Sequence, residues 1–84
     1  MKPLRFTDHA ELRVARRGLQ RDWIEAAVRE PQWREPEPDD PEVERRFRRI
    51  DEAGGRILRV ACVETEAEIR VITAMFDRNA KARS

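Results

Sequence analysis

The first eighteen residues predict a short strand followed by a helix. Leu4 to Phe6 alternates apolar, polar, apolar, as an edge strand does, and Thr7 is suited to cap a helix. Apolar positions then recur with helical spacing, which predicts a helix from about Asp8 to Arg17. Gly18 ends this helix, because glycine accepts the left-handed conformation that commonly closes helices.

A second helix is predicted from about Arg21 to Arg29, because apolar residues recur there with the same spacing and Pro31 stops it. Two helices joined at Gly18 make an αα-hairpin. The segment 31–42 holds four prolines among several acidic side chains. Since prolines sustain neither a helix nor a central strand, an exposed acidic, proline-rich loop is predicted over 31–42.

The second half of the chain changes to the period of strands. Residues 44–51 alternate weakly and carry four arginines, as an exposed or edge strand does. Residues 56–64 are apolar on both faces, which indicates a central strand, and 69–76 is rich in β-branched residues. A basic tail follows over 77–84. We therefore predict one α+β domain over 1–84, with a short strand and two N-terminal helices packed on an antiparallel sheet of three to four strands.

Charge is distributed unevenly behind a net charge of +1. From 30 to 44 there are seven acidic residues and one basic residue, whereas 45–84 holds ten basic and six acidic residues. Arginine supplies 16 of the 18 basic residues, and its planar fork suits phosphate and carboxylate better than lysine does. Either contact with nucleic acid or a genome that uses arginine as its default surface cation would produce this composition. The opposite signs predict that the 31–42 loop partly screens the basic face.

Cysteine usage and hydropathy exclude several classes of site. The lone cysteine, Cys62, lies in an apolar run, which predicts a buried, inert thiol and no disulfide framework or metal-ligand cluster. No apolar stretch resembles a signal peptide or approaches the roughly 20 residues that span a bilayer. We expect no cofactor, no metal, no membrane contact and a cytoplasmic location.

The first helix carries its charges on one side. At about 100° per residue, Leu12, Val14 and Ala15 point broadly one way. A sector about 60° wide on the other side of the helix holds basic side chains: His9, Arg13 and Arg16, with Arg17 at its edge. We expect this face to be one that the core does not need.

Two segments resemble a family of small bacterial domains of unknown function. Members carry H-A-x-x-R-x-x-x-R-G near the start, which is present here as His9, Ala10, Arg13, Arg17 and Gly18, and an apolar-Val-apolar-Thr segment, present at 70–73. The charged strand with Glu44, Arg45 or Arg46, and Phe47 is similar to that of BrnT-type toxins. Both groups look like relatives of the RelE/ParE toxins of toxin-antitoxin systems. The chain departs from the pattern at Gln20, where members often have a Ser or Thr that caps the second helix.

This resemblance implies a RelE/BrnT-like toxin domain, a metal-independent ribonuclease or translation inhibitor that acts on RNA or the ribosome and has a small antitoxin protein as its partner. Metal-free cleavage needs a base, an acid and a cation at the phosphorane; histidine can transfer the proton and arginine can supply the charge. The candidate catalytic residues are His9, Arg13, Arg17 and Arg46. The candidate RNA-binding residues are Arg16, Arg48, Arg59, Arg78 and Lys81.

Other interpretations stay open. The same surface could hold RNA or an acidic antitoxin segment without cleavage, or the arginines could pair with the chain's own acidic loop or with a second subunit of an interaction protein. His9 could also hydrogen-bond a backbone carbonyl and fix the helix, with Arg13 in an ion pair. Arg46 and Arg48 point to one face of their predicted strand and Arg45 and Arg49 to the other. The sequence does not say which of these pairs lies beneath the helices.

Overall fold

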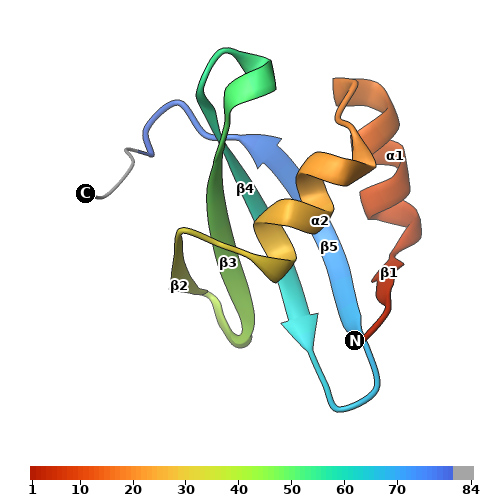
Figure 1. Cartoon of the computed structure of the whole chain (residues 1–84). Helices are drawn as coiled ribbons and strands as arrows, with labels where there is room; N and C mark the ends of the chain where they lie inside the picture. Colours follow the sequence, from red (N-terminus) through yellow and green to blue (C-terminus); the bar gives the residue numbers. More distant parts are fainter. Residues whose placement is uncertain (81–84) are drawn as a thin grey trace.

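Two helices lie against one face of a five-stranded sheet (Figure 1), which confirms the predicted α+β class. The computed structural model describes residues 1–80. In chain order the elements are β1 (Leu4–Phe6), α1 (Asp8–Arg17), α2 (Arg21–Arg29), β2 (Trp33–Glu37), β3 (Asp40–Ile50), a 3-10 turn (Asp51–Ala53), β4 (Arg56–Glu64) and β5 (Ile69–Phe76).

The strands follow the order β1-β5-β4-β3-β2 across the sheet. As its apolar character predicts, β4 is the central strand. The neighbours β2/β3, β3/β4 and β4/β5 are antiparallel, but β1 pairs with β5 in parallel. The expected purely antiparallel sheet of three to four strands is therefore wrong in two respects, because the sheet contains one parallel pair and a fifth strand.

The fifth strand comes from the segment predicted to be a loop. β2 and the beginning of β3 form a hairpin at the edge of the sheet, and the register shifts between Pro36 and Glu37. An edge strand tolerates proline because one of its sides needs no donor. Trp33 stacks on Phe47 with ring centroids 4.8 Å apart and an interplanar angle of 7°. Cross-strand contacts such as this one fix 31–42 to the sheet, despite its four prolines.

One hydrophobic core fills the space between the helices and the sheet. α1 lies on β5 and β1, whereas α2 lies on β4 and β3. Leu58, Val60 and Cys62 alternate along β4 and are fully buried against the helices, so the prediction of a buried thiol is confirmed. On β3 the core residue is Ile50, which by alternation also places Arg46 and Arg48 on the helix face and Arg45 and Arg49 on the opposite face.

Candidate nucleic-acid interface

α1 is fixed at both ends by local signals in the sequence. The Thr7 hydroxyl accepts a hydrogen bond from the backbone N–H of Ala10 at 3.1 Å, as an N-cap does. At the other end Gly18 has φ +62°, and the N–H of Leu19 reaches the carbonyl of Val14 at 3.1 Å. This left-handed closure explains the R-G ending of the H-A-x-x-R-x-x-x-R-G motif in conformational terms.

The rotation of α1 differs from the predicted one. Its buried residues are Ala10 and Val14, whereas Leu12 is 52% exposed and Ala15 is exposed. The small side chain of Ala10, which is 0% exposed, lets the helix backbone approach the sheet closely. The predicted burial of Val14 is confirmed, but that of Leu12 and Ala15 is wrong, because the prediction weighted the larger Leu12 over Ala10.

This rotation turns Arg17 toward the sheet. Arg17 follows Ala10 by seven positions and Val14 by three, so it lies above the same stripe. Its Nη1 donates a hydrogen bond to the carbonyl of Ala74 on β5 at 2.7 Å. Arg17 stays exposed and outside the core, as predicted, but its side chain also fastens α1 to β5.

The other three candidates of α1 remain available to a ligand. His9 and Arg16 are exposed and Arg13 is half-buried at the edge of the helix. None of their three side chains makes a hydrogen bond or an ion pair with any of residues 1–80. The ion pairs considered for Arg13 and the backbone hydrogen bond considered for His9 do not form in this part of the chain.

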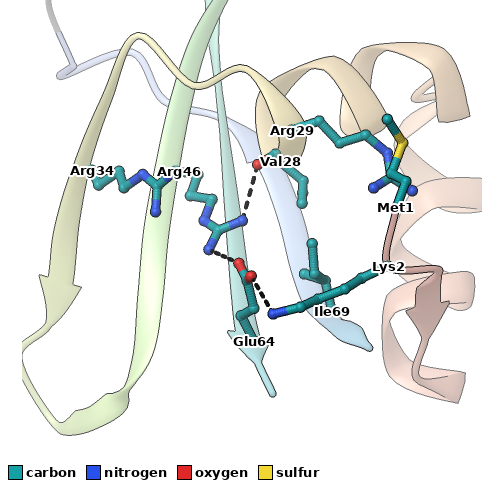
Figure 2. Close-up of a pocket in the computed structure, with 8 residues that line it drawn as sticks. All are labelled: Met1, Lys2, Val28, Arg29, Arg34, Arg46, Glu64 and Ile69. Atoms are coloured by element: carbon teal, nitrogen blue, oxygen red, sulfur yellow. Dashed lines mark hydrogen bonds and ion pairs between the residues drawn. The ribbon is translucent and has the colours of Figure 1, made fainter. Parts of the chain in front are cut away.

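Arg46, the fourth candidate catalytic residue, is buried on the helix face of β3, with only 4% of its surface exposed. Its Nε donates to Glu44 at 2.8 Å, its Nη1 to the carbonyl of Val28 at 2.9 Å and its Nη2 to Glu64 at 2.7 Å. Glu64 also pairs with Lys2 at 2.8 Å (Figure 2). One guanidinium thus joins the end of α2 to β3, β4 and the beginning of the chain.

The charges of this network stabilise one another. Hydrogen bonds from Lys2 and then from Arg46 lower the pKa of Glu64 from 4.5 to about 2. Burial lowers the pKa of Arg46, but its hydrogen bonds to Glu64 and Glu44 outweigh burial, and the net shift of the pKa is upward. β4 separates β3 from β5, and α1 lies on β5 and β1. The structure therefore does not bring Arg46 together with His9.

The remaining candidate residues fall in several places. Arg48 donates to the Glu30 carbonyl at 2.7 Å, beside the end of α2. Arg59 lies on the open face of the sheet and pairs with Asp77 at 3.0 Å. Arg78 is exposed in a turn at 77–80, where the predicted tail begins. Lys81, and the rest of that tail to 84, lie outside the described residues.

The acidic segment neutralises β3 rather than α1. Glu37 on β2 accepts two hydrogen bonds from Arg45, both at 2.9 Å, and Glu44 lies 3.4 Å from Arg34. β2 occupies the sheet edge opposite β1, where α1 begins. The segment 31–42 therefore lies beside the arginines of β3 and at the edge of the sheet away from α1. That it partly screens the basic face stays a prediction.

Five of the six arginines without a carboxylate partner within residues 1–80 lie on α1 or at its C-terminal end. Most basic residues within 1–80 form ion pairs. Those of this range that do not are Arg13, Arg16, Arg17, Arg48, Arg56 and Arg78. The first three lie on α1, and Arg17, Arg56 and Arg78 line one cavity at its C-terminal end. Sequence reasoning missed Arg56, because only the tertiary fold brings it beside Arg17.

Arginines without a carboxylate partner within residues 1–80 have guanidinium donors that can pair with anionic groups. Within residues 1–80 there is no group of three or more His, Cys, Asp or Glu side chains placed to hold a metal ion. No helix in that range is long and apolar enough to cross a bilayer. Arginines that lack carboxylate partners can instead donate to phosphate oxygens, which form most protein contacts with nucleic acids.

Comparison with known proteins gives a family match over most of the chain. The model of a domain of unknown function, DUF4258, matches residues 6–76. No curated protein and no solved structure matches the chain.

Proposed function

The chain belongs to the DUF4258 family, and on this premise we propose that it is an RNA-binding domain of the RelE/BrnT toxin type, which holds RNA along α1. One observation carries the proposal: the arginines that lack a carboxylate partner within residues 1–80 are concentrated on α1 and at its C-terminal end. A merely solvated surface would scatter such arginines over the molecule. Here the other arginines of residues 1–80, with the exception of Arg48, form ion pairs.

Salt dependence of RNA affinity tests this proposal. Each phosphate contact with single-stranded RNA contributes a slope of about −0.7 to log K against log salt. Three contacts, from Arg13, Arg16 and Arg17, give a slope of about −2, so raising salt from about 50 to about 200 mM should weaken binding roughly twentyfold. Fluorescence anisotropy with a labelled single-stranded oligonucleotide measures both quantities.

A pair of double variants locates the contact. Arg13→Gln with Arg16→Gln should reduce the slope by about 1.4, because two phosphate contacts are lost. The matched control is Arg5→Gln with Arg49→Gln, which removes the same charge from side chains that are 66% and 55% exposed on the other face of the sheet. If both double variants lower RNA affinity equally, binding follows net charge and the proposed interface on α1 is wrong.

RNA cleavage is a second candidate, favoured by the exposure of His9 beside Arg13 and Arg16 on α1. In metal-free cleavage a base takes the 2′-hydroxyl proton, O2′ attacks phosphorus, the P–O5′ bond breaks and an acid protonates O5′, which leaves a 2′,3′-cyclic phosphate. His9 can perform one of these two proton transfers.

With a chelator present, His9→Gln should retain RNA binding and lose the cyclic phosphate product. If the wild-type chain leaves RNA intact, both free and on ribosomes, at concentrations that saturate binding, the function is binding alone.

A further inference from the structure

A cavity of about 300 Å³ lies at the C-terminal end of α1 and contains three arginines. Arg17 enters it from α1, Arg56 from the beginning of β4, and Arg78 from the turn after β5. In Figure 1 these three segments lie at the same, upper end of the molecule. Leu19, Met75 and Phe76 complete the lining, so none of the described residues around this cavity is acidic.

Two of the arginines are held in place by partners that carry no charge. Arg17 Nη1 donates to the Ala74 carbonyl at 2.7 Å. Arg56 Nε donates to the Ala53 carbonyl at 2.9 Å, and its guanidinium carbon lies 3.9 Å from the centre of the Phe76 ring. Carbonyls and a ring face orient a guanidinium without neutralising it. Since each guanidinium has five N–H donors, most donors of both side chains remain free for a ligand.

The carboxylate of Asp77 lies close to this cavity, but both of its oxygens already accept hydrogen bonds from other groups. It lines the adjoining cavity of about 270 Å³, which shares Arg56 and Arg78 with the first. Its Oδ2 accepts from Arg59 at 3.0 Å, and its Oδ1 accepts from the backbone N–H groups of Asn79 and Ala80 at 2.9 and 3.2 Å. Arg59 therefore balances Asp77, and the three arginines keep their charge uncompensated.

We propose that this cavity binds a phosphate monoester, the terminal phosphate of an RNA chain whose backbone lies along α1. A monoester carries a charge of about −1.5 to −2 at neutral pH, against −1 for a phosphodiester in the backbone, so it matches three arginines better. The cavity is larger than a phosphate group needs, which leaves room for the attached nucleoside beside Phe76. The phosphate site stands on the geometry above, whereas its assignment to an RNA end rests on the proposed function.

Titration of the whole chain with small anions tests the site independently of RNA. In amide-resolved NMR, inorganic phosphate and adenosine 5′-monophosphate should shift the signals of Gly55, Arg56, Asp77 and Arg78, whereas adenosine should not. Arg78→Gln should weaken phosphate binding about tenfold, the loss expected for one charge-assisted hydrogen bond. Arg78 makes no hydrogen bond or ion pair with residues 1–80, so this variant keeps the fold. The double control Arg5→Gln with Arg49→Gln should bind phosphate as the wild type does.

Oligonucleotides that differ only at their ends test the assignment. RNA with a terminal phosphate should bind about tenfold more tightly than the same RNA with hydroxyl ends, and Arg78→Gln should abolish the difference. A flat phosphate titration, or phosphate binding that Arg78→Gln leaves unchanged, overturns the site even if RNA still binds along α1. Equal affinity for both RNAs overturns the assignment to a chain end. If no RNA binds but phosphate still titrates the cavity, the proposed function fails and the phosphate site stands.

Discussion

Replacing Arg46 by methionine should destabilise the protein, because this residue acts as a buried structural cation. The substitution keeps most of the aliphatic stem and removes the hydrogen bonds to Glu44, Glu64 and the Val28 carbonyl. Removing one partner of a fully buried ion pair costs about 3–5 kcal/mol. Here the two carboxylates are 38% and 37% exposed and can be hydrated again, so the cost should fall to about 2–3 kcal/mol.

Denaturation followed by circular dichroism and tryptophan fluorescence measures this loss. For a chain of this size, about 2–3 kcal/mol corresponds to a fall in Tm of about 10–20 °C. Arg49→Met is the matched control on the same strand: Arg49 is 55% exposed and its partner Asp51 is 82% exposed. Such surface pairs contribute at most about 1 kcal/mol. If the unfolding free energy of Arg46→Met lies within about 0.5 kcal/mol of the wild-type value, the structural role is refuted. If the same variant also loses RNA affinity, Arg46 belongs to the RNA-binding site.

The same network predicts how stability depends on pH. The pKa of Glu64 is about 2 in the folded chain against an ordinary 4.5. Because folding lowers this pKa, the stabilisation is complete above about pH 4.5 and is lost as the pH falls toward about 2. The whole shift would correspond to about 3 kcal/mol, but a side chain that is 37% exposed is screened by solvent, and about 1 kcal/mol is a better expectation. The difference in unfolding free energy between wild type and Glu64→Gln should therefore vanish near pH 2. The exposed Glu52, which has no ion pair within residues 1–80, supplies a control whose Gln variant should show no such change.

Two further predictions concern the end of α1 and the core. Gly18→Ala should lower the unfolding free energy by about 1–2 kcal/mol, because φ is +62° at this position, although no atom lies within 4 Å of the added Cβ. Gly18→Asn should lower it less, since asparagine tolerates this conformation better. Equal stability of the wild type and both variants would contradict the left-handed closure of α1 at Gly18. Burial raises the pKa of Cys62 to about 11, so at pH 8 a disulfide reagent should modify this thiol only as fast as the chain opens. Complete modification within seconds in native buffer would show that Cys62 is accessible.

Both helices were predictable because their signals act within a few residues. Thr7 caps α1 by accepting from a backbone N–H three residues later, and Gly18 closes it through its own φ angle. The missing cap of α2 was also readable, since Gln20 makes no side-chain hydrogen bond there. The bounds of these two helices therefore agree with the prediction, and the bounds of β4 and β5 agree with it as well.

The features that the sequence did not reveal depend on distant partners. β1 pairs with β5, which lies more than sixty residues away in the sequence. β2 is held in the sheet by contacts across a hairpin, in which Trp33 stacks on Phe47 and Glu37 pairs with Arg45. The rotation of α1 depends on how closely the helix approaches the sheet, a property set by the small Ala10 rather than by the most hydrophobic residue of the helix. Of the predicted RNA site, the structure keeps His9 and Arg16 exposed on α1 with the half-buried Arg13, and it places Arg46 in a separate network.

Separation of charge within the fold explains how a chain with a net charge of only +1 can present a basic surface. The acidic residues of 31–42 lie on β2 and in its hairpin, and β3 and β4 separate them from β5, on which α1 lies. At about 4.8 Å between neighbouring strands, β2 and β5 are about 14 Å apart. The Debye length at physiological ionic strength is about 8 Å. The acidic edge is thus screened from α1, so it does not cancel the charge of the arginines on α1 that lack a carboxylate partner within residues 1–80. An RNA affinity that rises when Glu37 alone is replaced by Gln would contradict this separation, because the released Arg45 lies on β3, beside the edge strand β2, and on the face of the sheet opposite α1.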